Sequence, residues 1–487
     1  MSRPTGESRM LIDGELVEAE GGGLFDVTDP ATGLVAGQAA DGSAHDVARA
    51  VQAARRAHDR GQWSRDVGFR HHCLKQLEAA LREERERLRQ IEVTEVGAPI
   101  SLTPALIDGP INEVAFWAEF GREFDYLVDN GVKRVGQNSA RHFIHYDAPG
   151  VVGVITPWNA PFYLNISDTM APLMAGNAVV LKPAPLSPWA GSELGRLIAE
   201  KTDIPAGVFN VVLSNANEVG AALVADPRVD VITFTGSTAT GRRILAAAAP
   251  TVKKSILELG GKSAHIVLDD ADLSSCLPRS AASVAVMSGQ ACIMRSRILL
   301  PRRRMAEGVE ILRSVLESIT VGDPWDPATV QGPLISEQQR HKVLQLIAEG
   351  VRDGGTLVTG GSIPAHLTDG FFVEPTLLTD VDPSSTVAQE EIFGPVLTVT
   401  PYDSDDEAVA IANDTIYGLS GEVSGADEDR AVRIALRMKT GTVSVNGAPF
   451  SHLDSPFGGF KQSGLGRRNG VHGFREYLEP KTIAVPN

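Results

Sequence analysis

The sequence predicts an α/β fold built on doubly wound parallel sheets, because short apolar strands alternate with segments of helical length. Runs rich in β-branched residues lie at 151–155, 177–182, 209–213, 229–235 and 254–259. Segments such as 190–201 and 239–249 separate them and have helical composition. Strands that are apolar on both faces are typical of a parallel sheet covered by helices on both sides. A second stretch of the same kind runs from about 262 to 460, so two such sheets are expected in 487 residues.

The flanking segments predict smaller elements. Positions 1–60 suggest short strands and turns, and 69–89 suggests one helix with Leu74, Leu77, Leu81 and Leu88 on one face. The charged run within that helix, 82–89, is interpreted as a solvated face. Residues 126–148 predict an extended hairpin that projects from the body, and the last dozen residues predict a terminal strand.

Composition excludes several classes of protein. The chain is 43% hydrophobic and 22% charged, which is ordinary for a globular protein and excludes extensive disorder. Its net charge of −16 disfavours nucleic-acid binding. Three cysteines form no disulfide framework and suggest a reducing compartment. No apolar run is long enough to span a membrane and no signal-peptide core stands at the start, so we expect a cytoplasmic protein without a membrane span.

Two residues are candidates for nucleophilic catalysis. Cys292 lies in a glycine-containing turn before the apolar run 297–301, whereas Cys73 and Cys276 are interpreted as buried packing residues. Glu258 ends a buried strand between two leucines, where burial would suit it to act as a general base. The alternative for Glu258 is an ion pair with Lys253 or Lys262.

Two loops that follow predicted strands offer polar donors. Asn159, after the strand at 151–155, could donate its amide to a developing oxyanion. The turn that begins at Gly236 and Ser237 opens a helix whose free amides could bind a diphosphate. An ordinary turn explains either loop as well. The common dinucleotide fingerprint G-x-G-x-x-G is absent, and Ile256 stands where a P-loop requires glycine.

Nine collinear motifs resemble the aldehyde dehydrogenase superfamily along nearly the whole chain. They are DPATG (29–33), PWNAP (157–161), LKPA (181–184), FTGSTATG (234–241), LELGGKS (257–263), GQAC (289–292), EEIFGPV (390–396), NDTIYGLS (413–420) and PFGGFKQSGLGR (456–467). The spacing between Glu258 and Cys292 in the sequence is typical of the hydrolytic members. The resemblance implies the aldehyde dehydrogenase fold, with two doubly wound parallel-sheet domains and a small β element for oligomerisation.

The resemblance also implies a mechanism. Cys292 would attack an aldehyde, Asn159 and the Cys292 backbone amide would hold the oxyanion, and Glu258 would activate water to hydrolyse the thioester after hydride transfer to NAD. The expected cofactor-binding residues are Thr156, Pro157, Trp158, Lys182, Gly236, Ser237, Leu259, Gly260, Glu391 and Phe393. Among these, Lys182 would contact the adenine-side ribose, Ser237 the diphosphate, and Glu391 the nicotinamide-side ribose.

Four departures from the family pattern bear on specificity. Pro185 replaces a ribose-binding Glu, so NADP is possible although NAD is expected. The loop 214–217 lacks the usual glycines. Arg468 stands where the family commonly has an acid. Ala160 replaces a bulky aromatic and could widen the substrate tunnel.

The substrate expected from these positions is a medium or bulky apolar aldehyde, because no charged residue lines them. The resemblance places Tyr163, Leu164, Ser167, Ile293 and Phe457 along the tunnel. No metal site is expected, and the neighbouring histidines His71 and His72 are interpreted as surface and core residues.

The implied organisation has three parts. Residues 1–125 and 149–260 would bind NAD(P), 261–465 would form the catalytic domain, and 126–148 with 466–487 would form the oligomerisation element of a homodimer or homotetramer. The alternatives are a CoA-acylating relative, which Glu258 disfavours, a catalytically silent relative, and a thiol esterase without a redox role.

Overall fold

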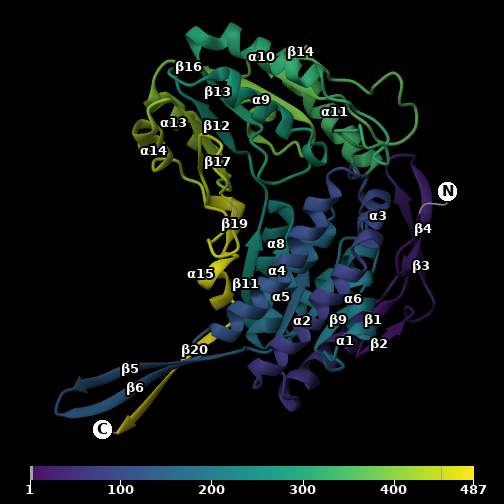
Figure 1. The fold of residues 1–487 in the computed structure, drawn as a ribbon, viewed down its shortest axis with the longest axis vertical. Helices are drawn as coiled ribbons and strands as arrows, with labels where there is room; N and C mark the ends of the chain where they lie inside the picture. The colour runs from purple at the N-terminus through teal and green to yellow at the C-terminus, as the bar shows by residue number, and fades with distance from the viewer. Residues whose placement is uncertain (1–3, 451, 487) are drawn as a thin grey trace.

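The computed structural model describes residues 4–450 and 452–486. Two lobes face each other, and each is built around one sheet, while an arm of three strands projects from one lobe (Figure 1). The predicted α/β class with parallel sheets is confirmed. No helix in the described part of the chain is long and apolar enough to cross a membrane.

The first sheet has eight strands in the order β19-β11-β10-β7-β8-β9-β1-β2. Its five central strands are parallel and coincide with the predicted runs, and the two edges are antiparallel. The bounds are β1 Met10–Ile12, β2 Glu15–Val17, β7 Val151–Ile155, β8 Ala178–Lys182, β9 Phe209–Val211, β10 Val231–Thr235, β11 Lys254–Glu258 and β19 Gly464–Leu465. The central strands are buried because helices cover both faces, which explains why their sequences are continuously apolar.

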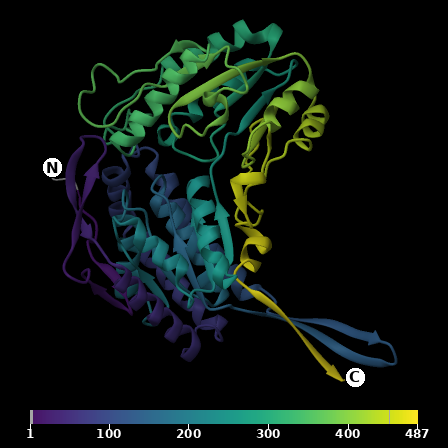
Figure 2. The same ribbon diagram turned by 180° about the vertical axis from the view of Figure 1, so that it is seen from behind.

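The second sheet has seven strands in the order β14-β15-β16-β13-β12-β17-β18, all parallel except β14. The bounds are β12 Ala264–Val267, β13 Arg297–Pro301, β14 Thr356–Thr359, β15 Thr376–Thr379, β16 Val396–Tyr402, β17 Gly421–Ser424 and β18 Ser444–Val445. Separate apolar clusters pack on its two faces. A two-stranded sheet of β3 Leu24–Asp29 and β4 Leu34–Ala40 flanks the first lobe (Figure 2).

Helices on opposite faces of the first sheet are α1, α7 and α8 on one side and α5 and α6 on the other, with α4 packed outside α5. The second sheet is covered by α9 and α10 on one face and by α13 and α14 on the other. The bounds are α1 Ala44–Arg60, α2 Val67–Glu83, α3 Arg85–Val96, α4 Thr103–Glu123, α5 Pro161–Ala175, α6 Trp189–Lys201, α7 Asn217–Ala225, α8 Thr238–Ala248, α9 Leu273–Ser283, α10 Met305–Glu317, α11 Glu337–Arg352, α12 Thr386–Gln389, α13 Asp405–Asn413, α14 Glu428–Ala435 and α15 Gly470–Arg475.

Two sequence expectations about helices were wrong. The helix predicted for 69–89 is two helices, α2 and α3, which divide at Glu84. The segment expected to hold only strands and turns also contains α1, which begins at a capping box in which Ser43 and Asp46 bond each other's backbone amides. That box was the sequence signal for the missed helix. The run 82–89 is not only a solvated face, because Arg87 forms an ion pair with the buried Glu193 of α6.

The arm is a three-stranded antiparallel sheet in which β6 Asn138–Asp147 lies between β5 Leu127–Val135 and β20 Glu479–Pro486. The hairpin and the terminal strand are therefore where the sequence placed them. The element expected at 466–487 is shorter, because α15 and residues Phe474, Tyr477 and Leu478 pack into the core of the first lobe. The boundary between lobe and arm lies after Leu478, because the apolar side chains before it are buried in the lobe whereas every residue of β20 is exposed.

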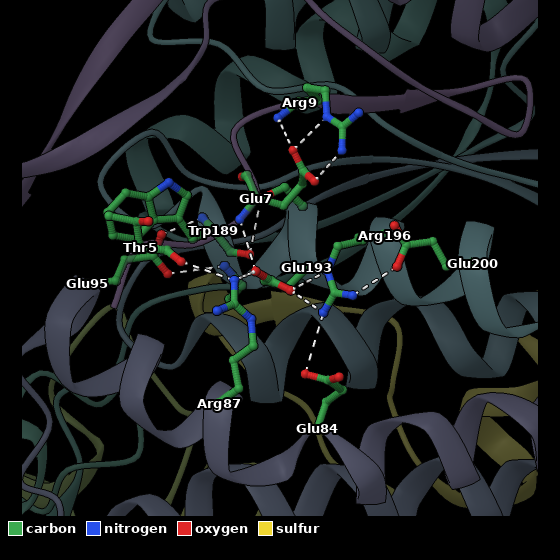
Figure 3. Close-up of polar contacts among 12 residues, drawn as sticks. Thr5, Glu7, Arg9, Glu84, Arg87, Glu95, Trp189, Glu193, Arg196 and Glu200 are labelled. Carbon is green, nitrogen blue, oxygen red and sulfur yellow. Dashed lines mark hydrogen bonds and ion pairs between the residues drawn. The ribbon is translucent and has the colours of Figure 1, made fainter. Parts of the chain in front are cut away.

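Helix α3 joins the first lobe through buried carboxylates, as Figure 3 shows for one of them. Glu95 accepts hydrogen bonds from the backbone amides of Trp189 and Ala190, which begin α6. Glu92, one turn earlier, bonds the backbone amide of Phe162 at the start of α5. One helix thus supplies acceptors to the free amide ends of two others, which is the position where carboxylates are favoured.

Candidate active site

The predicted catalytic residues lie between the two lobes. From the first sheet the site takes loops that follow the strands: Asn159 lies beyond the end of β7, and Glu258 is the last residue of β11. From the second sheet it takes segments that precede strands, because Cys292 lies before β13 and Glu391 before β16. The carboxyl edge of one parallel sheet therefore faces the amino edge of the other.

The turn that carries Cys292 has an uncommon backbone. Met287, Ser288 and Gly289 all have positive φ, of 51°, 55° and 73°. Side chains hold this turn: the Ser288 hydroxyl donates to the Gly332 carbonyl at 2.7 Å, and Gln290 Oε1 accepts from the backbone amide of Ile335 at 3.0 Å. Strain fixed by surrounding contacts is typical of functional sites.

Asn159 lies against the same turn. Its Nδ2 donates to the Gln290 carbonyl at 2.8 Å, two residues before the nucleophile, and the side chain is buried. Pro161 opens α5 two residues after Asn159, so the helix fixes the loop from which the amide projects. The amide can therefore serve as an oxyanion donor beside Cys292.

Glu258 is buried without a hydrogen-bond partner among the described residues for either carboxylate oxygen. Burial raises its pKa to about 8, and Arg468 opposes that rise. The alternative of an ion pair with a lysine is wrong, because Lys253 Nζ donates to the Asp226 carbonyl and Lys262 Nζ has no hydrogen-bond partner in the described chain. A free carboxylate with a pKa near neutrality is suited to accept a proton.

The Cys292 thiol needs such an acceptor. Burial raises its pKa to about 12, and the carboxylates of Glu391 and Glu258 add to the rise while Arg468 opposes it. The cysteine is therefore a thiol at neutral pH before a ligand binds. The buried residues Cys73 and Cys276 also have raised pKa values and lie in the apolar cores, as the sequence predicted.

Lys182 and the loop 214–217 lie together at the carboxyl edge of the first sheet. Among the described residues, the Lys182 ammonium donates only to two backbone carbonyls, of Pro183 at 3.3 Å and Ser214 at 3.4 Å, and burial lowers its pKa to about 8. Asp41 holds this loop, which lacks the usual glycines, because its carboxylate accepts hydrogen bonds from the Ser214 hydroxyl and the Asn215 backbone amide.

The Gly236 turn is built as a helix start. The Gly236 amide donates to the Glu258 carbonyl at 3.0 Å, and Ser237 caps α8 by accepting from the Thr240 amide at 3.3 Å. Behind it, the Leu259 amide donates to the Ser463 carbonyl. Thr156 lies in the other predicted cofactor loop. Its hydroxyl donates to Asn165 Oδ1 at 2.6 Å, so this hydroxyl is used in a hydrogen bond within the protein.

Glu391 lies over the glycine pair that joins the lobes. Its Oε1 accepts from the Gly261 amide at 2.9 Å, and a Cβ at position 260 would lie 2.5 Å from its Oε2. A side chain at position 260 would therefore have to displace the Glu391 carboxylate. Phe393 has a φ of 58° and its ring packs edge-on against Trp158 with centroids 5.3 Å apart, so these two predicted residues also meet.

The predicted substrate residues divide into two groups. Leu164 and Tyr163 join an apolar cluster with Ala160 and Met287, completed by Ala98, Leu102 and Leu106. Ser167 instead donates its hydroxyl to the buried Glu113 at 2.6 Å. Ile293 offers its carbonyl to the Ser420 hydroxyl, and Phe457 exchanges backbone hydrogen bonds with Arg468.

The sequence expectation missed a charged group beneath Glu258. Arg468, which the sequence marked only as a departure, is buried and forms an ion pair with Asp168 on α5 at 2.5 Å. Thr235, the last residue of β10, contacts both. Nothing in the local sequence connects residues 168 and 468, so only an unexplained acid inside the apolar helix α5 could have signalled the pair.

The fold and site define a class: an α/β protein that brings a cysteine, a side-chain amide and a buried carboxylate together between two parallel sheets. The model of the Aldehyde dehydrogenase family matches residues 16–483, and the chain belongs to this family. It is accordingly an enzyme of aldehyde oxidation.

Individual relatives and solved structures agree with the family match. A 3-succinoylsemialdehyde-pyridine dehydrogenase of Pseudomonas sp is 39% identical over 97% of each chain. Betaine aldehyde dehydrogenase of Staphylococcus aureus, solved in complex with NAD+, is 33% identical with a TM-score of 0.95, covering 99% of this chain and 95% of that one. Aldehyde dehydrogenase C of Pseudomonas syringae, solved as a C291A mutant with NAD+ and octanal, is 38% identical with a TM-score of 0.93, covering 99% and 98%.

Proposed function

We propose that this enzyme oxidises a medium or bulky apolar aldehyde to its carboxylic acid with NAD, through a thiohemiacetal and a thioester on Cys292. The observation that carries the proposal is the convergence of Cys292, Asn159 and Glu258 between the lobes. Each of the three arrives from a different element, and Asn159 bonds the turn of the nucleophile directly.

In the proposed reaction, the Cys292 thiol gives its proton to the Glu258 carboxylate as the sulfur attacks the carbonyl carbon, and Glu258 passes that proton to solvent before the hydrolytic step. The Asn159 amide and the Cys292 backbone amide donate to the resulting oxyanion. After the aldehyde hydrogen has left as hydride, Glu258 takes a proton from water, and the hydroxide attacks the thioester carbon. The thiolate departs and the carboxylic acid is released.

The residues present fit a dinucleotide. Three groups match the charges and hydroxyls of diphosphate and ribose: the buried Lys182 ammonium with its two long backbone hydrogen bonds, the helix start at Ser237 and the Glu391 carboxylate. NAD supplies the hydride acceptor when bound. Thr156, Pro157, Trp158, Leu259, Gly260 and Phe393 would complete this surface. Pro185 removes a carboxylate that would repel the extra phosphate of NADP, so NADP is the secondary cofactor of the proposal.

The apolar cluster around Ala160 supports the substrate class. Its members are leucines, alanines, a methionine and a tyrosine, so a charged aldehyde would lose hydration there without gaining a partner. Octanal in the Pseudomonas syringae neighbour has the expected character, whereas the names of the Staphylococcus aureus enzyme and of a pea relative, aminoaldehyde dehydrogenase 1, indicate charged substrates.

The test is an absorbance assay for the reduced nicotinamide, with aliphatic, aromatic and charged aldehydes and with NAD and NADP in turn. We expect turnover that is fastest with apolar aldehydes and NAD, and that disappears in Cys292→Ala. Preference for acetaldehyde or betaine aldehyde would overturn the substrate assignment. Turnover that requires CoA would overturn the hydrolytic step, and Glu258→Gln would then be without effect.

We also propose a homodimer or homotetramer formed through the arm. Strand β5 has one strand partner, β6, and its side chains are mostly exposed, so its outer edge offers unpaired backbone groups. Sedimentation at micromolar concentration tests this, and a monomer would contradict it.

A further inference from the structure

A closed triangle of polar groups lies at the base of the active site. Arg468 Nη2 is 2.5 Å from Asp168 Oδ1, and the same guanidinium donates to Thr235 Oγ1. The Thr235 hydroxyl in turn donates to Asp168 Oδ2 at 3.0 Å. All three side chains are buried, so this ion pair is shielded from solvent.

The triangle abuts Glu258. Thr235 is the strand neighbour of Glu258 in the register of β10 and β11. The segment that carries Arg468 folds over the same carboxylate, because a Cβ at Gly458 would lie 2.9 Å from Glu258 Oε1 and 2.8 Å from the Arg467 side chain. Backbone hydrogen bonds in both directions between Phe457 and Arg468 fix that segment.

Several charged groups face this region from the surrounding elements. Burial raises the pKa of Glu113 on α4, of Asp168 on α5 and of Glu258 on β11, and Arg468 opposes the rise in each. The other titratable groups here include Arg467, Tyr477, Cys292 and Tyr163 on α5. Arg468 itself stays charged: burial lowers its pKa, but Asp168, Glu258, Tyr477 and Cys292 together raise it by more.

A base in this position has two ways to fail. Without a nearby cation, a buried carboxylate holds its proton at neutral pH. With a cation bonded directly to it, the carboxylate is ionised but too weakly basic to take a proton from water. Glu258 avoids the second failure, since Arg468 is paired with Asp168 and both Glu258 oxygens are without a hydrogen-bond partner in the described chain. It lessens the first, because the charge of Arg468 opposes the rise of its pKa, which is about 8, so Glu258 ionises progressively as pH rises through that value.

We propose that Asp168 and Arg468 are positioning residues for the general base: Arg468 places a positive charge beside Glu258, and Asp168 keeps that charge from bonding the carboxylate. The inference rests on the proposed function, in which Glu258 activates water. Arg468 and Asp168 would therefore have opposite effects on Glu258: Arg468 favours its ionised form, and Asp168 limits how strongly Arg468 does so.

The opposite effects give the test. The acid limb is the part of the pH profile in which hydrolysis speeds up as the base loses its proton. Arg468→Gln removes the cation, so the acid limb shifts to higher pH by about one unit, the size expected when a carboxylate loses one nearby opposite charge. Asp168→Asn releases the guanidinium towards Glu258, so the limb shifts to lower pH and the rate on its plateau falls. Arg468→Lys keeps the charge and restores the wild-type limb.

The assay is the hydrolysis of 4-nitrophenyl acetate between pH 5 and 10 without cofactor, in which the phase after the nitrophenolate burst reports deacylation. Alkylation of Cys292 by iodoacetamide, followed by mass spectrometry, gives a second readout, and Arg468→Gln should slow it at a fixed pH. The matched control is Arg70→Gln, which removes another buried guanidinium, one bonded to the carbonyls of Trp63 and Met174. It should lower stability and leave the acid limb in place.

The outcomes separate this inference from the proposed function. If Glu258→Gln leaves the acid limb unchanged, Glu258 is not the base and the proposed function fails with the inference. If Glu258→Gln abolishes the limb but Arg468→Gln and Asp168→Asn shift it in the same direction or not at all, only the inference is overturned. Should either single variant fail to fold, the double variant Asp168→Asn/Arg468→Gln leaves no unpaired charge. Its limb should lie above that of wild type, and an unshifted limb would also overturn the inference.

Discussion

Glu92 on α3 offers a quantitative test of how the structure treats buried carboxylates. It is 1% exposed, its Oε1 has no hydrogen-bond partner in the described chain, and burial raises its pKa from 4.5 to about 8. Because the folded pKa is raised, the folded state loses stability as pH rises from the unfolded value of 4.5. The loss is complete above pH 8.

The magnitude follows from the free energy of a pKa shift, which is about 1.4 kcal/mol per unit. The loss is below about 1 kcal/mol at pH 5 and reaches about 4 kcal/mol at pH 8. Glu92→Gln keeps an oxygen for the Phe162 amide and removes this dependence. We expect the variant to gain about 3 kcal/mol more relative to wild type at pH 8 than at pH 5.

Thermal unfolding at the two pH values measures the effect. For a cooperative chain of this length, about 3 kcal/mol corresponds to a difference of about 3 °C in the midpoint shift. Glu86→Gln on the same helix is the matched control, because Glu86 is exposed and forms a surface ion pair with Arg89. Equal shifts of Glu92→Gln at pH 5 and pH 8 would refute the argument, since packing changes alone do not depend on pH.

Three further predictions concern the site. Asn159→Ala should lower kcat by about 100-fold to 1000-fold with little change in KM, because it removes an oxyanion donor; an unchanged kcat in steady-state assays would exclude that role. Gly260→Ala should displace Glu391 and weaken NAD binding in calorimetry, since the added Cβ would lie 2.5 Å from its carboxylate, and an unaltered Kd would argue against Glu391 as a ribose ligand. Ala160→Phe should reduce kcat/KM for octanal more than for acetaldehyde, and equal losses would place the tunnel elsewhere.

The central strands and the positions of the proposed catalytic residues were predictable because both depend on local patterns. Five apolar runs became the parallel strands of the first sheet, since strands buried on both faces need no alternation. Motif spacing located Cys292, Glu258 and Asn159, and these lie at the facing edges of the two sheets. The break at Glu84 was not predictable from the apolar pattern, because Leu74 to Leu88 keeps a helical period across it.

What the tertiary structure alone decided is the environment of each charge. Asp168 and Arg468 lie far apart in the sequence, so no local signal could pair them, and the pairing changes the pKa of a third residue, Glu258. The sequence determined which groups could react, because nucleophile, base and amide donor are properties of residue types in their motifs. Folding determined how those groups ionise, because desolvation and Coulomb interactions depend on neighbours that the chain brings together only in three dimensions.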